Sequence, residues 1–455
     1  MTEATFDRSA ISAFRFLRCG FDAATGEARL AYGFDEGPEL VETIQFPGAP
    51  FALDQTRAAA VEQALRLLHL IAGVSYYKAA APPQIRIESY GIDADTAAFL
   101  TEVYENGLGE FAYRNGLMLR GKIRFPVGAA SAATVAAPTV GLKSHALVAI
   151  GGGKDSLVSI EALKAAGVAQ TVTWIGGSPL IRACAERTGL PTLNIARTLA
   201  PELFEMNKRG ALNGHIPVTA INSAILVLAA LLHDADQVVF SNERSASYGS
   251  LIPGTGEVNH QWSKGWEFER AFARDLERHV AADLHYYSLL RPFSELAVAR
   301  QFARNDHYDA FFSSCNRNFH ILGDRPTQRW CGACPKCRFV FLALAPFMPK
   351  PRLLNIFGRN LLDEPDQAAG FDALIEYRDH KPFECVGEGV ESRAALAALA
   401  GSPSWREDAL VLRFEQEIRS QLDDSVLAVA PLLVASSEHG IPPAVWGALR
   451  AHFGA

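Results

Sequence analysis

A glycine-rich segment combines the residue types that bind phosphate groups. It consists of Gly151, Gly152, Gly153, Lys154, Asp155 and Ser156. Glycines let the backbone turn tightly enough to direct successive N–H groups at an anion, and the N-terminus of a following helix adds partial positive charge. The lysine supplies a full positive charge, the serine a hydroxyl donor, and the aspartate an oxygen ligand for Mg²⁺. We therefore expect a nucleotide phosphate site here.

Other interpretations fit this segment less well. In one, a glycine turn precedes a helix that Asp155 or Ser156 merely caps, but a cap requires one polar residue and not three glycines with a lysine. A Walker A loop would have glycine where the chain has Val148, and serine or threonine at Asp155. A dinucleotide-binding loop would have glycine at Ser156, and no acidic residue ends the next strand, which runs into residues 175–177.

Clustered cysteines are the second feature with clear chemistry. Cys331, Cys334 and Cys337 are each separated by two residues, and Cys315 is the nearest fourth thiol. Such spacing is typical of a structural zinc site. An iron–sulfur cluster would require another cysteine, followed by proline, soon after Cys337, and thiols packed without metal are a further alternative. We expect zinc at these four residues and core positions for the isolated Cys19, Cys184 and Cys385.

Alternating apolar strands and helices must position the glycine loop. The strand predicted over residues 146–150 runs directly into the loop, and a helix is predicted over residues 157–166 behind it. Further strands are expected at 171–175, 192–195 and 238–240, and helices at 181–188 and 221–232. This alternation is typical of a parallel α/β sheet. We expect the domain, with its cysteine cluster, to cover residues 139–349.

Polar residues 241–245 follow the strand predicted over 238–240. Open α/β sheets bind ligands at the carboxyl ends of their strands, so we expect substrate contacts from Asn242 and Arg244, with a solvated loop as the alternative. A proton transfer would require acid/base side chains. The candidates by chemistry are His215, Glu243 and His260.

The flanking regions are expected to form separate domains. Residues 1–138 combine strand-like alternation at 13–18, 28–32 and 118–125 with helical periodicity at 57–72 and 94–106, which indicates an α+β domain. Small residues fill the predicted linker at 127–138. Residues 350–455 are expected to be mostly helical, with helices at 392–399, 409–422 and 446–453. In the first domain, Tyr76, Tyr77 and Lys78 are candidates for substrate recognition, with core packing as the alternative for both tyrosines.

Composition excludes several classes of protein. The chain of 455 residues has 49% hydrophobic and 20% charged residues, the balance of a globular protein. Its net charge of −7, with no long basic run, disfavours nucleic acid as a partner. The longest apolar runs fall short of the roughly 18 residues that a membrane span requires, and the first residues lack a secretory signal. We expect a cytoplasmic protein without membrane insertion.

The glycine loop resembles the Ser-Gly-Gly-X-Asp-Ser loop of the ATP-pyrophosphatase superfamily, also called PP-loop or adenine nucleotide alpha-hydrolase-like. Gly152, Gly153, Asp155 and Ser156 match, whereas Gly151 replaces the first serine, which puts one contact to the leaving pyrophosphate in doubt. The resemblance implies that ATP and Mg²⁺ bind here and that ATP is split into AMP and pyrophosphate, with AMP transferred to a substrate oxygen. The cysteine spacing resembles the zinc-binding tail of the deazapurine-synthesis branch, apart from a longer gap after Cys315.

Strings along the whole chain carry a second, more specific resemblance. They are residues 70–78, 150–156, 240–248, 257–262, 330–337 and 380–385. The chain is similar to the UDP-N-acetyl-α-D-muramoyl-L-alanyl-L-glutamate epimerases of bacterial peptidoglycan synthesis. This resemblance implies ATP- and Mg²⁺-dependent inversion of the terminal L-Glu of a UDP-muramoyl dipeptide to D-Glu. Adenylation of a glutamate carboxylate, exchange of the Cα proton and hydrolysis would accomplish it.

Two other functions stay open at this point. One is an adenylating enzyme of tRNA modification or deazapurine synthesis, and the other is a nucleotide-binding regulatory protein without turnover. The acidic balance and the lack of interleaved aromatic and basic residues weigh against RNA. A pure binder would not need Lys154, Asp155 and the cysteine cluster together. The oligomeric state is not indicated by the sequence.

Overall fold

A nine-stranded sheet runs through the protein, in the order β11-β8-β5-β6-β7-β3-β2-β1-β4. The computed structural model describes residues 5–128, 137–252, 256–319 and 325–454. The strands of this sheet are β1 (Ala13–Asp22), β2 (Glu27–Phe34), β3 (Leu40–Gln45), β4 (Gln84–Ile87), β5 (Lys143–Ala149), β6 (Gln170–Ile175), β7 (Thr192–Thr198), β8 (Ala235–Phe240) and β11 (His285–Ser288). A separate hairpin pairs β9 (Ser250–Ile252) with β10 (Gly256–Val258). The expected α/β class is confirmed.

The strands β11, β8, β5, β6 and β7 are all parallel. From β5 the chain proceeds to β6 and then β7 on one side, and later returns to place β8 and β11 on the other side. The order therefore reverses between β5 and β8, and the loops that leave these two strands meet at that point. Open α/β sheets bind ligands at such a switch point. The strands and helices predicted between residues 146 and 240 are confirmed.

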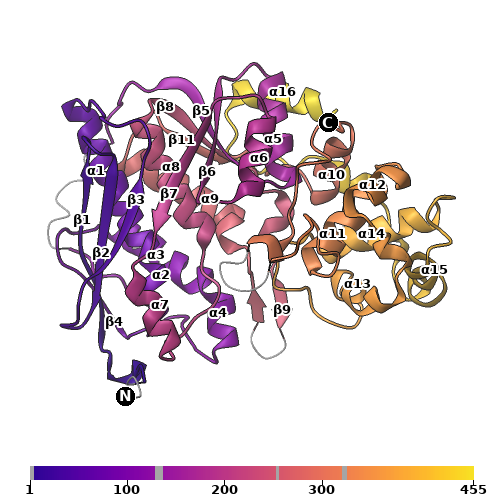
Figure 1. The fold of residues 1–455 in the computed structure, drawn as a ribbon, viewed down its shortest axis with the longest axis horizontal. Helices are drawn as coiled ribbons and strands as arrows, with labels where there is room; N and C mark the ends of the chain where they lie inside the picture. Colours follow the sequence, from indigo (N-terminus) through magenta and orange to yellow (C-terminus); the bar gives the residue numbers. More distant parts are fainter. Residues whose placement is uncertain (1–4, 129–136, 253–255, 320–324, 455) are drawn as a thin grey trace.

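The N-terminal strands extend the same sheet. β1, β2 and β3 are antiparallel neighbours, β3 pairs antiparallel with β7, and β4 pairs parallel with β1. In Figure 1 these strands lie on one side of the molecule, the parallel strands in the middle and the C-terminal helices on the far side. The boundary predicted near residue 138 thus falls between strands of one continuous sheet. Most of the predicted linker, residues 129–136, lies outside the described residues.

Helices cover both faces of the sheet. They are α1 (Gln55–Ala72), α2 (Val74–Tyr77), α3 (Ala94–Gly107), α4 (Gly109–Arg114), α5 (Lys154–Ala165), α6 (Pro179–Arg187), α7 (Pro201–Lys208), α8 (Val218–Leu232), α9 (Trp266–His279), α10 (Glu295–Ala303), α11 (Pro335–Leu344), α12 (Lys350–Phe357), α13 (Ala368–Leu374), α14 (Gly389–Ala400), α15 (Ala409–Arg413) and α16 (Pro443–Phe453). Successive residues of β5 point to opposite faces: Leu147 packs into one core, while Ala146 and Val148 pack into the other. No helix in the described part of the chain is both long and apolar enough to cross a membrane.

Two predicted elements differ in the structure. The strand expected at residues 118–125 is wrong: this segment is irregular, with a turn closed by Lys122 N–H donating to the Leu119 carbonyl at 2.9 Å. Leu119, Ile123 and Phe125 are buried, so the apolar spacing reflects burial without a strand partner. The helix expected at 409–422 is shorter, because α15 passes into a π-helical turn (Phe414–Ile418) and a 3₁₀ turn (Arg419–Gln421).

Candidate active site

The glycine loop leaves β5 at the switch point of the sheet. Gly152 has φ +81°, a conformation that favours glycine, and Gly153 is the N-cap of α5. No side chain caps this helix, and the Ser156 hydroxyl donates to the Gly153 carbonyl at 3.2 Å. The alternative in which Asp155 or Ser156 serves as a helix cap is therefore wrong. The first N–H groups of α5 lack a side-chain acceptor, which is the arrangement that binds an anion.

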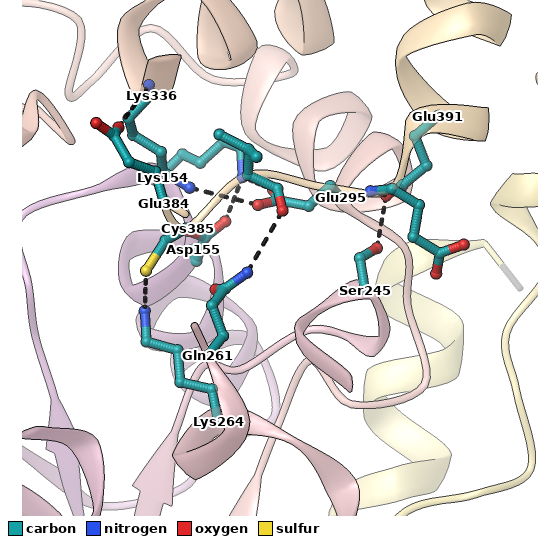
Figure 2. Close-up of polar contacts among 12 residues, drawn as sticks. Lys154, Asp155, Ser245, Gln261, Lys264, Glu295, Lys336, Glu384, Cys385 and Glu391 are labelled. Carbon is teal, nitrogen blue, oxygen red and sulfur yellow. Dashed lines mark hydrogen bonds and ion pairs between the residues drawn. The ribbon is translucent and has the colours of Figure 1, made fainter. Parts of the chain in front are cut away.

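A buried charge cluster lies directly behind the loop. Lys154 is fully buried, and its ammonium group bonds the carboxylates of Asp155 and Glu295, the first residue of α10. Lys336, in the first turn of α11, places Nζ 3.5 Å from Glu295 Oε1. Figure 2 shows these side chains converging from the loop, α10 and α11. Burial alone lowers the pKa of Lys154, but the charges of Asp155 and Glu295 outweigh it and raise that pKa.

Glu243 occupies the loop after β8, on the other side of the switch point. Glu243 is 5% exposed, and its side chain makes no hydrogen bond or ion pair with the described residues. Burial, followed by the nearby negative charges of Glu295 and Asp155, raises the pKa of Glu243 to about 7. A carboxyl group in this state is suited to give or take a proton near neutral pH.

Two of the predicted acid/base residues, His215 and His260, lie side by side next to Glu110 of α4. The rings of His215 and His260 lie 4.1 Å apart, and Nδ1 of His260 bonds the carboxylate of Glu110. Burial lowers the pKa of His260, but hydrogen bonds to Cys385 and Glu110 outweigh it and raise that pKa to about 9. Burial, then the charge of His260, lowers the pKa of His215 to about 3. Single ligand atoms of Glu110, His215 and His260 lie within 4.8 Å of one another, close enough to hold a metal ion.

Cys385 is a residue of this site that the sequence did not indicate. Its sulfur lies 3.0 Å from Lys264 Nζ, at the end of a 3₁₀ turn (Trp262–Lys264), and it is half-buried rather than packed in the core. Burial raises the pKa of Cys385, but the charges of Lys264 and His260 outweigh this and lower it to about 5. The core assignment is wrong for Cys385, since Cys385 lies among charged groups.

The predicted substrate residues have other partners in this structure. Tyr76 and Tyr77 are enclosed in the core, where the Tyr76 hydroxyl accepts from Ala200 N–H at 3.0 Å and the Tyr77 hydroxyl donates to the Pro82 carbonyl at 3.3 Å. These contacts favour the packing alternative for both tyrosines. Lys78 lies 3.3 Å from the Gly214 carbonyl.

The other predicted substrate residues, in the loop after β8, make hydrogen bonds within the protein. Asn242 donates to the Ser288 hydroxyl at 2.9 Å, and Arg244 donates to the Val434 and Leu432 carbonyls at 3.2 and 3.4 Å. Arg244 thereby ties this loop to the C-terminal segment. Unlike Asn242 and Arg244, Glu243 keeps its side chain available for a ligand, and the buried Ser241 hydroxyl in the same loop also lacks a partner among the described residues.

The four clustered cysteines converge on one point. Their sulfur atoms all lie within 4.8 Å of one another, and the Cys331 and Cys337 sulfurs are 3.7 Å apart. Tetrahedral zinc with Zn–S bonds of about 2.3 Å places neighbouring sulfurs about 3.8 Å apart. Backbone N–H groups of Ala333 and Cys334 donate to Cys331 Sγ at 3.4 and 3.3 Å. The grouping of Cys315 with the other three is confirmed, and the geometry fits zinc.

The comparisons with known proteins agree with this α/β architecture and its cysteine-bearing C-terminal part. Residues 5–289 match the family described as MurL N-terminal domain, and residues 311–428 match the MurL C-terminal domain. The chain therefore belongs to the MurL family. A protein of Xanthomonas oryzae pv. oryzae named UDP-N-acetyl-alpha-D-muramoyl-L-alanyl-L-glutamate epimerase is 72% identical over 450 residues, 99% of each chain.

Two further proteins of the same name are similar at lower identity. One from Salinispora tropica is 44% identical over 88% of each chain, and one from a Micromonospora species is 42% identical over 95% of this chain and 96% of its own. No solved structure matches the chain. The epimerase family resemblance found in the sequence is confirmed by these matches.

Proposed function

We propose that this protein inverts the terminal L-glutamate of UDP-N-acetylmuramoyl-L-alanyl-L-glutamate to D-glutamate for peptidoglycan synthesis, and that it uses ATP to do so. The names of the similar proteins support the substrate and the inversion. The observation that carries the ATP requirement is the uncapped glycine loop at the switch point, beside a cluster of carboxylates and lysines. The strand order supports a PP-loop domain.

The chemistry explains why an epimerase would consume ATP. A free carboxylate strongly disfavours loss of the neighbouring Cα proton, because the resulting carbanion would lie beside an existing negative charge. In the proposed reaction the glutamate carboxylate oxygen attacks the α-phosphorus of ATP, and the bond to pyrophosphate breaks. The acyl adenylate can then accept the electrons of the Cα–H bond at its carbonyl oxygen. Water finally cleaves the adenylate and releases AMP and the D-glutamate product.

The residues at the loop fit a bound Mg²⁺. Asp155 is partly exposed next to the glycines, and Glu295 pairs with the same lysine, Lys154, as Asp155 does. Carboxylate oxygens of the kind that Mg²⁺ prefers are therefore present. Mg²⁺ bound there would neutralise charge on the phosphates. Lys154, buried between the carboxylates of Asp155 and Glu295, holds both in place. Lys336 adds a second positive charge beside Glu295.

The nucleotide product tests this function. Purified protein with ATP, Mg²⁺ and the UDP-muramoyl dipeptide should release AMP and pyrophosphate, whereas a kinase or a simple ATPase would release ADP. In D₂O the D-glutamate product should carry deuterium at Cα. Inversion that proceeds without ATP, or without exchange of the Cα hydrogen, would contradict the proposal. A protein that binds ATP but forms no AMP with any substrate would instead support the regulatory alternative.

A further inference from the structure

Three segments far apart in the chain meet around the sulfur of Cys385. His260 bonds Glu110 of α4 through Nδ1, and its positive charge acts on the Cys385 sulfur. Lys264 approaches the same sulfur at 3.0 Å, as Figure 2 shows. A thiol beside a lysine ammonium and near a histidine that a carboxylate orients has the positive surroundings that activate cysteines in enzymes. Cys385 is thus equipped as a reactive thiolate.

Cys385 also lies next to the groups behind the glycine loop. Its neighbour Glu384 accepts a hydrogen bond from Lys336 N–H at 3.1 Å, and Lys336 is the residue that reaches Glu295. The positive charge of Lys336 acts on Cys385 as well. The thiol therefore belongs to the region where the α-phosphate of ATP would meet a substrate carboxylate.

Glu243 supplies the second, independent observation. Most of this residue is buried, and no hydrogen bond or ion pair with the described residues holds its carboxylate, so the group is free to act on a ligand. Its charge interacts with those of Lys154, Lys336 and Lys264, and Lys264 is the lysine that contacts Cys385. Glu243, in the loop after β8, and Cys385, in the segment before α14, therefore both interact with Lys264.

We propose that Cys385 and Glu243 are the two groups that exchange the proton at the glutamate Cα, a role that rests on the proposed function. Inversion needs a deprotonated group on one face of Cα and a protonated group on the other. The pKa of Cys385, about 5, and that of Glu243, about 7, provide this difference between the two groups around pH 6. His260, Lys264 and Glu110 are positioning residues that keep the thiolate charged.

The step balances with these residues alone. The Cys385 thiolate takes the Cα hydrogen as a proton, so the S–H bond forms and the C–H bond breaks. The electron pair moves into the Cα–carbonyl bond, and the carbonyl electrons move to oxygen as the enolate of the acyl adenylate. Glu243 then gives its proton to the opposite face of Cα, and the electrons return to the new C–H bond. Exchange with solvent restores the protons on sulfur and carboxylate.

Exchange from each epimer separately tests the proposal. The variants are Cys385→Ala, Cys385→Ser and Glu243→Gln, with Cys19→Ala, at the far N-terminal strands, as the control. Each site variant should lose inversion by at least about hundred-fold. With L- and D-glutamate substrates in D₂O, the Cys385 variants should keep Cα exchange with one epimer only, and Glu243→Gln with the other only. Isotope exchange between pyrophosphate and ATP should persist in all of them.

The possible outcomes separate the proposal from the function on which it rests. Failure of wild-type protein to form AMP would overturn the proposed function. If AMP forms but Cys385→Ala inverts normally, the thiol has no role. Loss of exchange with both epimers in folded Cys385→Ser that still exchanges pyrophosphate would also overturn the acid/base assignment, because loss of a base on one face leaves exchange from the other face intact. Unchanged inversion in Glu243→Gln would remove Glu243 from the pair.

Discussion

The backbone N–H of Ser313 donates to the carbonyl of Gly152 at 2.9 Å. This bond connects the glycine loop to the segment that leads into Cys315, so the cysteine cluster supports the loop directly. We therefore expect removal of zinc to weaken ATP binding as well as stability, because metal ligation contributes to folding of the surrounding segment. Elemental analysis should find about one zinc per chain.

The matched variants for this prediction are Cys334→Ser, which loses a ligand, and Cys19→Ser, which does not. Cys334→Ser should lose zinc, melt several degrees lower and bind ATP more weakly, as calorimetry would show. A Cys334→Ser protein that is metal-free yet as stable and active as wild type would exclude a structural site. Iron with visible absorbance would overturn the choice of zinc.

The three glycines of the loop should respond differently to alanine. A Cβ at Gly151 would meet no heavy atom within 4 Å, whereas at Gly153 it would force the Ser314 hydroxyl to rotate away. At Gly152 the positive φ alone costs an alanine about 1–2 kcal/mol. Gly151→Ala should therefore stay near wild type in stability and ATP affinity, Gly152→Ala should lose both, and Gly153→Ala should mainly lose ATP affinity because Ser314 shifts beside the loop.

Thermal melts and ATP titration measure this series. Gly151→Ser should be tolerated equally well, since the position has room for a hydroxyl. That variant also restores the serine of the PP-loop pattern, so tighter ATP binding would support the superfamily assignment. Equal loss at all three positions would show that the loop geometry described here is wrong.

Substitution of Lys154 should lower both stability and turnover, whereas substitution of Asp155 should lower turnover alone. Lys154→Ala leaves the buried carboxylate of Glu295 and the partly exposed one of Asp155 without the lysine between them, which costs roughly 3–5 kcal/mol, so stability and turnover should fall together. Asp155→Asn keeps the shape and removes one charge from a partly exposed position, so it should stay folded and lose AMP formation. Denaturant melts and a nucleotide product assay separate the two effects.

Lys154→Met combined with Glu295→Gln provides the control for burial. The double variant should recover much of the stability that Lys154→Ala loses, since it leaves fewer unpaired charges in the interior. It should not recover turnover. Recovery of AMP formation in this double variant would remove Lys154 and Glu295 from the proposed nucleotide site.

Local patterns in the sequence predicted the loop, its flanking strand and helix, and the cysteine cluster, because each is encoded by neighbouring residues. The site around Cys385 could not be predicted in this way. Its members come from α4, the turn at Lys264 and the segment before α14, and only the fold brings them together. A thiol isolated in the chain looks like a core residue until its charged neighbours are known.

At residues 118–125 the sequence predicted a strand that the structure does not contain. The alternation there was real, since Leu119, Ile123 and Phe125 are buried. Periodicity reports which side chains face the core, but a strand also needs a neighbouring strand, and none pairs with this segment in the described chain. The turn at Gly121, with φ +76°, interrupts the extended backbone.

The last prediction concerns the charge of Cys385 in the free protein. Lys264, His260, Lys336 and Lys381 surround it with positive charge, against the carboxylate of Glu384. Its pKa is lowered to about 5, so the thiolate is present above that pH and is lost as the pH falls through it. Burial raises the pKa of Cys19 to about 11, so Cys19 stays a thiol throughout the neutral range.

Alkylation by iodoacetamide, followed peptide by peptide with mass spectrometry, measures this difference. At about pH 6.5 Cys385 should react far faster than Cys19, since only the thiolate is nucleophilic. Lys264→Met removes the nearest charge and should move the reactivity midpoint of Cys385 upward by a unit or more, while Cys19 is unaffected. Bound substrate should protect Cys385 if the thiol faces the reacting carbon. Equal, slow labelling of the two cysteines at this pH would show that the pairing with Lys264 and His260 does not generate a thiolate.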